Sequence, residues 1–212
     1  MVIIDARTAE GRAEALDRAA AELIAGWPVI VPTDTVYGIA ALPGSVRAST
    51  ALFEMKGRPD DLPIAILVSD IDQARALSQG FSEDCQEMVR RGWPGPLTVV
   101  VHRHPAVSLE IGARDSTVGL RCPDHSFLRD LARLVGPMAT TSANRHGEPT
   151  PADVKDVVRL FPGVRVAIDG GECGSAPSTV VDCTRPQPTI IRQGAFRAEA
   201  AVPPVATGVE LS

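Results

Sequence analysis

The stretch 27–40 places the tightest limits on how this chain folds, because it passes from a buried strand directly into a run of polar groups. It reads WPVIVPTDTVYGIA. The apolar residues 29–31 predict a buried strand, and Pro32, which has no N–H for a sheet ladder, predicts its end. Two hydroxyls, a carboxylate and the only tyrosine of the chain follow before Gly38. Polar groups just past a strand end are typical of ligand sites in open α/β sheets.

The same polar segment has a second interpretation. Asp34 and its neighbouring threonines can form a β-turn by bonding their own backbone. The segment taken by itself leaves both interpretations open.

The composition fits a single globular domain over residues 1–212. With 44% hydrophobic and 22% charged residues in 212, the chain can bury a sizeable core. No apolar run approaches the roughly 18 residues of a membrane helix, and acidic residues come too early for a secretory signal, so we expect a cytoplasmic protein without membrane contact. The four scattered cysteines indicate reduced thiols, and we interpret His102 and His104 as strand-end residues. We therefore predict no metal site built from side chains.

The charge of the chain bears on which partners it binds. A net charge of −5 argues against tight nucleic-acid binding, so we expect weak or no direct contact with RNA. The chain has two lysines, and one of them, Lys56, stands two residues before Arg58 at the end of a predicted helix. Gly57 and Pro59 order the turn between them, which predicts an anion clamp. The alternative is a helix C-terminus whose basic residues oppose the macrodipole.

Periodicity and turn residues predict the remaining elements. Helices are expected over residues 8–25, 45–55, 70–77, 82–91, 125–135 and 150–160. Strands are expected over residues 29–31, 64–68, 97–101, 117–123, 138–141, 164–168, 178–182 and 189–194. Strands outnumber the helices that can cross between them, which favours an α/β (α+β) fold with a mixed sheet.

A second polar cluster follows the predicted strand at 138–141. Ser142, Ala143 and Asn144 lead to Gly147 and then to Thr150, which we expect to N-cap the next helix with Pro151 at its first position. A strand, a serine and asparagine, a glycine and a helix N-terminus in this order form an anion cradle. The alternative is a capped loop in which the serine and asparagine satisfy backbone groups.

Six sequence blocks occur in the order found in the YrdC-like family. They read PTDTVYG at 32–38, KGRP at 56–59, WPGPLT at 93–98, TVGLR at 117–121, SAN at 142–144 and STVVD at 178–182. The chain resembles this family over about residues 9–195, with a tail at 196–212 and no room for the extra C-terminal domain of longer members. The resemblance implies a twisted mixed parallel and antiparallel sheet, flanked by helices, around a large concave and positively charged cavity.

The resemblance also implies an activity. It is that of L-threonylcarbamoyladenylate synthase, which forms threonylcarbamoyl-AMP and pyrophosphate from L-threonine, bicarbonate and ATP for the threonylcarbamoyladenosine modification of tRNA. Mg²⁺ would accompany ATP, and tRNA threonylcarbamoyl transferase proteins would act downstream. The chain would be a monomer or a homodimer.

The resemblance assigns site residues by matched position. Those expected to act in catalysis are Lys56, Arg58, Ser142 and Asn144. Those expected to face ATP are Arg58, Thr117, Ser142, Asn144, Thr150 and Arg192. Those expected to hold L-threonine are Thr35, Arg121, Thr140 and Ser178, where Arg121 is suited to pair with the substrate carboxylate through two hydrogen bonds.

Two other functions compete with synthesis. A YciO-type paralogue shares the fold and would bind RNA or nucleotides without efficient synthesis. The hydrogenase maturation proteins transfer carbamoyl groups, but they carry an acylphosphatase-like domain and zinc-finger cysteines that this sequence lacks. The chain also departs from the family pattern at Leu62, Leu67 and His146, each of which removes a polar group near the expected site.

Overall fold

A computed structural model describes residues 1–56, 64–109, 116–145, 147–174 and 176–197, apart from the side chain of Lys56. Arg58, Leu62 and His146, and with them the turn after Lys56, lie outside the described residues. Among the helices that are described, none is both long and apolar enough to cross a membrane.

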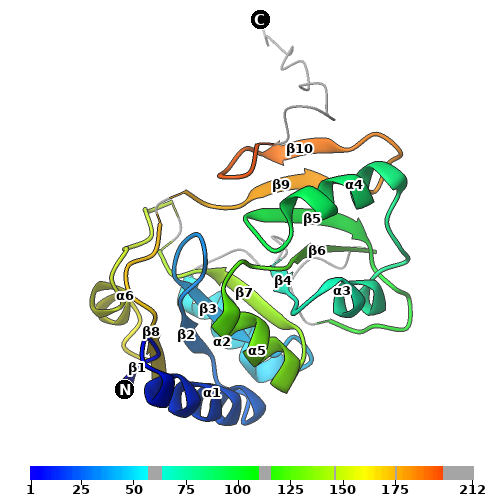
Figure 1. Ribbon diagram of the computed structural model, residues 1–212. Helices are drawn as coiled ribbons and strands as arrows, with labels where there is room; N and C mark the ends of the chain where they lie inside the picture. Colours follow the sequence, from blue (N-terminus) through cyan, green and yellow to red (C-terminus); the bar gives the residue numbers. More distant parts are fainter. Residues whose placement is uncertain (57–63, 110–115, 146, 175, 198–212) are drawn as a thin grey trace, which may run out of the picture.

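The described chain alternates short strands with helices (Figure 1). The strands are β1 Val2–Asp5, β2 Val29–Val31, β3 Gly38–Ala41, β4 Ala65–Leu67, β5 Leu97–His102, β6 Thr117–Arg121, β7 Met138–Ser142, β8 Val166–Asp169, β9 Thr179–Asp182 and β10 Thr189–Arg192. The helices are α1 Ala9–Ile24, α2 Val46–Lys56, α3 Ile71–Leu77, α4 Glu83–Gly92, α5 Ser126–Val135 and α6 Val154–Leu160.

All the described strands join one sheet, in the order β1-β8-β2-β3-β7-β4-β6-β5-β9-β10. The pairs β1/β8, β2/β8, β4/β6 and β5/β9 are parallel, and the remaining neighbours are antiparallel. The predicted mixed sheet is therefore confirmed. Because β6 pairs with β4 on one side and β5 on the other, residues from distant parts of the sequence meet in the middle of the sheet.

Helix starts follow the local chemistry of the sequence. Thr8 caps α1 by accepting a hydrogen bond from the Gly11 amide at 3.1 Å, as predicted. Asp70 and Ser82 cap α3 and α4 in the same way. The predicted cap at Thr150 is wrong, because α6 begins three residues later, where the Asp153 side chain accepts from the Lys155 amide at 2.6 Å.

Two strands were missed, and one apolar residue of the first helix is exposed. β1 and β3 are only 4 residues each, and β3 has the sequence GIAA, which lacks the β-branched enrichment that marks a strand. On α1 the buried residues are Ala15, Ala19, Ala20 and Leu23, whereas Ile24 is 69% exposed. The small alanines let α1 lie close to α5, and Ile24 sits at the end of the helix, past that contact.

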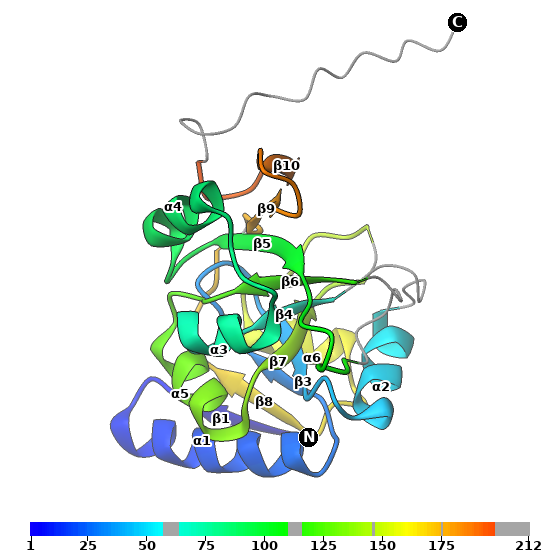
Figure 2. The same cartoon turned by 90° about the vertical axis from the view of Figure 1, so that its right-hand side faces the viewer.

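The two faces of the sheet are covered by different helices. Val29 and Val31 of β2 pack with α1 and α5, whereas Ile30 packs in the cluster that contains α2 and α6, because successive strand residues point to opposite faces. Figure 2 shows α2 and α5 on opposite sides of the sheet. The helices α3 and α4 cover the part near β5 and β6, which contributes Val99 and Leu120 to the core.

Candidate active site

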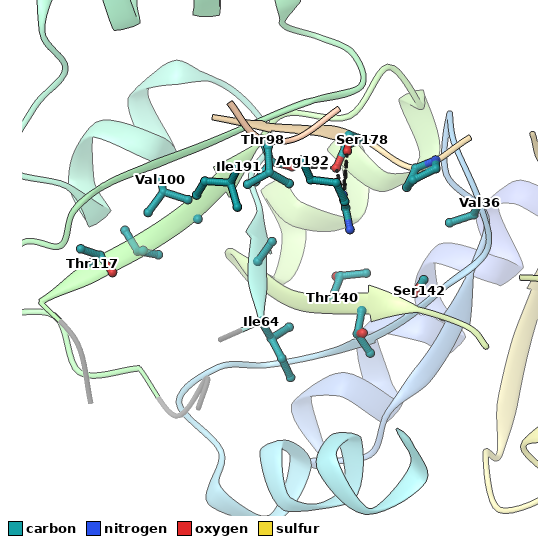
Figure 3. A pocket seen from close by; sticks show the side chains of 16 residues that line it. Val36, Ile64, Thr98, Val100, Thr117, Thr140, Ser142, Ser178, Ile191 and Arg192 are labelled. Atoms are coloured by element: carbon teal, nitrogen blue, oxygen red, sulfur yellow. Dashed lines mark hydrogen bonds between the residues drawn. The ribbon is translucent and has the colours of Figure 1, made fainter. Parts of the chain in front are cut away.

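A cavity of about 390 Å³ lies against the middle of the sheet (Figure 3). Its walls come largely from alternate residues of four neighbouring strands, because every second side chain of a strand points to the same face. The strand residues of this series are Thr98 and Val100 of β5, Thr117 and Gly119 of β6, Ala65 of β4, and Thr140 and Ser142 of β7. Pro177, Ser178, Val180, Ile191 and Arg192 close the cavity from the β9 and β10 side. The volume is within the usual range for a small-molecule site.

The cavity brings together residues that the sequence predicted for two different ligands. Thr117, Ser142 and Arg192 were assigned to ATP, and Thr140 and Ser178 to L-threonine, and all five side chains line the same space. Figure 3 shows Thr140 and Ser142 on one wall and Ser178 with Arg192 on the facing wall.

Arg192 is held on Ser178 by several hydrogen bonds. Its Nε and Nη2 donate to the Ser178 carbonyl oxygen at 3.3 and 2.9 Å, and Nη2 also reaches the Ser178 Oγ at 3.3 Å. A β-bulge between Ile190 and Arg192 turns both Ile191 and Arg192 toward the cavity. Gly194 permits this approach, because a Cβ there would lie 2.5 Å from the Ser178 carbonyl oxygen.

The hydroxyl of Ser178 also meets Thr98. The two Oγ atoms lie 2.9 Å apart, and both residues are buried. Partial burial lowers the pKa of the Arg192 guanidinium, which nevertheless stays charged at neutral pH because arginine starts far above it. This wall of the cavity thus offers two hydroxyls and a fixed cation.

The threonines at the end of β2 form a compact hydroxyl cluster. The Thr33 Oγ1 accepts from the amides of Thr35 and Val36 at 3.0 and 3.1 Å and donates to the Val36 carbonyl oxygen at 2.7 Å. Since its one proton is used there, Thr35 is the donor in the 2.9 Å contact between the two hydroxyls. The turn interpretation is therefore right for Thr33.

The side chains of Asp34 and Thr35 instead accept hydrogen bonds from Arg121, at the end of β6. The Arg121 Nη2 lies 2.6 Å from the Asp34 Oδ1, Nη1 donates to the Thr35 Oγ1 at 3.0 Å, and Nε donates to the Gly95 carbonyl oxygen at 3.2 Å. The two charged side chains are 8% and 11% exposed. Burial lowers the pKa of Arg121, and the Asp34 carboxylate opposes that shift.

Thr35 and Arg121 therefore lie behind the cavity wall, and neither is among the side chains that line it. Two polar atoms of this region are buried without a hydrogen-bond partner in the described structure, the Asp34 Oδ2 and the His125 Nδ1. Burial lowers the pKa of His125, and the nearby Asp34 charge opposes that shift.

Ser142 and Asn144 are joined to each other and to the segment at 32–38. The Ser142 Oγ donates to the Asn144 Oδ1 at 2.6 Å, and the Asn144 Nδ2 donates to the Glu148 carbonyl oxygen. The Ala143 amide donates to the Tyr37 carbonyl oxygen at 2.7 Å, where β3 and β7 pair. Two motifs that are far apart in the sequence are thus adjacent. Thr150 and Asn144 are not among the lining residues of the cavity.

Sequence reasoning missed two residues that hold the site together. Thr98 stands at the end of the WPGPLT block, and its place on a predicted strand next to a bend was a usable signal. Tyr37 is fully buried, donates its hydroxyl to the Gly171 carbonyl oxygen at 2.7 Å and accepts from the Gly170 amide at 3.3 Å. Burial raises the pKa of Tyr37 above its usual value, so it remains a neutral anchor.

A twisted mixed sheet with a hydroxyl-rich cavity and a fixed arginine defines an α/β protein that binds a small polar ligand. The family model described as "Telomere recombination", which covers the Sua5, YciO and YrdC proteins, matches residues 21–194. The chain belongs to this family, and the YrdC-like resemblance is confirmed.

Relatives and solved structures agree with this assignment. A protein of Mycobacterium tuberculosis is 36% identical over 197 residues, which are 92% of this chain and 91% of that protein. The threonylcarbamoyl-AMP synthase of Mus musculus is 36% identical over 83% of this chain and 65% of its own length. The crystal structure of Pyrococcus abyssi Sua5 complexed with L-threonine superposes with a TM-score of 0.84 at 34% identity, over 92% of this chain and 58% of that one.

Proposed function

We propose that the chain is an L-threonylcarbamoyladenylate synthase, which makes threonylcarbamoyl-AMP and pyrophosphate from L-threonine, bicarbonate and ATP. The observation that carries the proposal is the shared cavity, in which residues expected at ATP and residues expected at threonine line one space of about 390 Å³. The relatives named for this activity, and the family member solved with L-threonine, support it.

The reaction asks mainly for orientation and charge neutralisation. The threonine amine adds to bicarbonate with loss of water to give a carbamate, whose oxygen then attacks the α-phosphorus of ATP and displaces pyrophosphate. Arg192, held on Ser178, supplies a fixed positive charge beside the reacting anions. The Ser142 hydroxyl lines the cavity and donates its proton to the Asn144 Oδ1 at 2.6 Å, which fixes the hydroxyl beside the ligand.

Mg²⁺ belongs to the proposal as the ion that lowers the charge of the departing pyrophosphate. Within the described residues no three His, Cys, Asp or Glu side chains group as metal ligands. We therefore propose the phosphate oxygens as its ligands, with water completing the shell.

The setting of the reaction follows from its product. We propose that tRNA threonylcarbamoyl transferase proteins consume the threonylcarbamoyl-AMP, that the chain acts with them in the cytoplasm, and that it does so as a monomer or a homodimer.

The test is incubation of the purified protein with ATP, L-threonine and bicarbonate, followed by measurement of pyrophosphate and threonylcarbamoyl-AMP. We expect both products only when all three substrates are present. Arg192→Ala should reduce the rate by about a hundredfold, whereas Arg159→Ala, which removes an exposed arginine of α6, should leave it unchanged. A pure nucleotide-binding paralogue would yield neither product, and that result would overturn the proposal.

A further inference from the structure

A second cavity, of about 530 Å³, lies between α3, α4 and α5. Figure 2 shows α3 between the other two helices. The cavity opens past the carboxyl ends of the parallel pair β4 and β6, where Ser69 and Cys122 line it. Ligands of open α/β sheets commonly bind outside the carboxyl ends of parallel strands. This cavity shares no lining residue with the candidate active site.

Two aromatic rings form one wall of this second cavity. Phe81 and Trp93 meet edge to face, with ring centroids 6.4 Å apart and an interplanar angle of 84°. The Trp93 Nε1 donates to the Leu97 carbonyl oxygen at 2.7 Å, which fixes the orientation of the indole. Both rings are half-buried. A fixed corner of this kind offers a stacking face to a planar heterocycle.

Four arginines from three helices surround the same space. They are Arg75 of α3, Arg90 of α4, and Arg129 and Arg133 of α5. Each is paired with a nearby carboxylate, those of Asp72, Glu87, Asp124 and Asp130. A guanidinium carries five N–H donors, so one such pair leaves donors for a phosphate. The pairs of Arg75, Arg90 and Arg133 are exposed and contribute little to stability, so exchanging one of their carboxylates for a phosphate costs little free energy.

Among the described residues, Asp70 is the one acidic residue that lines the cavity. Its Oδ1 accepts from the amides of Asp72 and Gln73, and its Oδ2 accepts from the Ser69 hydroxyl at 2.7 Å. These hydrogen bonds keep the pKa of Asp70 below its usual value and hold its carboxylate at the start of α3. The charged donors that the cavity offers to an anionic ligand are the arginines.

We propose that this cavity is a second binding site and that its ligand is a nucleotide, with the base against Phe81 and Trp93 and the phosphate on the arginines. A nucleotide combines the two chemistries that the walls offer, a planar ring and a multiply charged oxyanion. A free mononucleotide and an unpaired nucleotide of an RNA share this chemistry. The net charge of −5 and the pairing of each arginine favour the free nucleotide, because a polyanion is attracted by unpaired basic charge. This site does not depend on the function proposed for the first cavity.

The test uses Trp93 as the reporter. The chain has two tryptophans, so Trp27→Phe leaves Trp93 as the only one. We expect AMP to quench its fluorescence and to give a matching calorimetric isotherm. Adenosine and inorganic phosphate, which each supply half of the contacts, should bind at least about tenfold more weakly. A single-stranded uridine hexanucleotide separates the two sources, because it binds more tightly than UMP only if an RNA nucleotide is the ligand.

Three further variants, each made in the Trp27→Phe background, test whether AMP binds in this second cavity. Arg90→Ala combined with Arg133→Ala removes two exposed cations and should weaken AMP binding about tenfold or more. Arg159→Ala breaks the same kind of pair on α6, outside the cavity, and should have no effect. Arg192→Ala changes the other cavity and should leave the Trp93 signal intact. No response to AMP or to the hexanucleotide at millimolar concentration, or a response abolished by Arg192→Ala, overturns the proposal.

Discussion

The buried pair of Asp34 and Arg121 makes a sharp prediction about stability. In Arg121→Met the Asp34 carboxylate loses its counterion while its side chain stays only 11% exposed. The Asp34 Oδ2 already has no partner within the described structure, so no second donor is in place to compensate. An uncompensated buried charge of this kind costs about 3–5 kcal/mol. The Thr35 hydroxyl loses a donor as well, which adds about 1 kcal/mol.

The double variant Asp34→Leu with Arg121→Met separates the charge from the contacts. It leaves no buried ion, and exchanging a buried pair for apolar side chains is often neutral or stabilising. We therefore expect the double variant to recover most of the stability that Arg121→Met loses. Urea unfolding of the wild type, both single variants and the double variant gives the coupling free energy.

Enzyme kinetics on the same variants test the role of the pair at the site. If Arg121 positions the threonine end of the cavity, both Arg121→Met and the double variant raise the KM for threonine more than the KM for ATP. If Arg121→Met lowers the free energy of unfolding by less than about 1 kcal/mol, against the 3–5 kcal/mol expected for an ion pair shielded from water, then water reaches Asp34 and the reasoning is refuted. A double variant less stable than the single one would refute it as well.

Three further predictions follow from single contacts. Tyr37→Phe leaves the Gly171 carbonyl oxygen without its donor and should cost about 1–3 kcal/mol in urea unfolding. Thr98→Val removes the hydroxyl 2.9 Å from the Ser178 Oγ and should raise the threonine KM roughly tenfold with little change for ATP, whereas an equal rise for both substrates would contradict it. The folded-state pKa of His125 lies below its unfolded value of about 6.5. The unfolded state therefore binds the proton first, and the free energy of unfolding falls as the pH drops through that value. His125→Gln should flatten this part of the curve of melting temperature against pH, and an unchanged slope would exclude His125 as its source.

The strands that form the cavity were predictable because they are long or strongly apolar. The segments 97–101 and 117–123 contain runs of β-branched residues, and they became β5 and β6 within two residues of the predicted ends. Once such strands are known, their period of two fixes which side chains share a face. Thr98 and Val100 of the predicted strand 97–101 could thus be placed on one face from sequence alone, although β3 between β2 and β7 could not be predicted, since its GIAA sequence resembles many loops and helices.

The contacts across the site were beyond sequence reasoning because they depend on strand order and on local irregularities. Arg121 and Asp34 are 87 residues apart, and they meet although β3, β7 and β4 lie between β2 and β6 in the sheet, because the loop after β2 that carries Asp34 reaches the end of β6. The resemblance assigned Arg121 to the threonine carboxylate, but it could not show that its guanidinium is already engaged by Asp34, Thr35 and Gly95. The bulge that aims Arg192 is one extra residue in β10, which periodicity does not reveal.

The turn at 92–95 explains why the sequence keeps tryptophan, prolines and glycines together. The Gly95 amide donates to the Cys122 carbonyl oxygen at 2.8 Å, and the Gly95 carbonyl oxygen accepts from the Arg121 Nε at 3.2 Å. A Cβ at Gly95 would lie 2.6 Å from the Gly92 carbonyl oxygen, so the turn closes only with glycine there. On its other side, Trp93 lines the arginine-rich cavity. One turn therefore sets both the position of Arg121 behind the candidate active site and the place of the Trp93 ring that faces the second cavity.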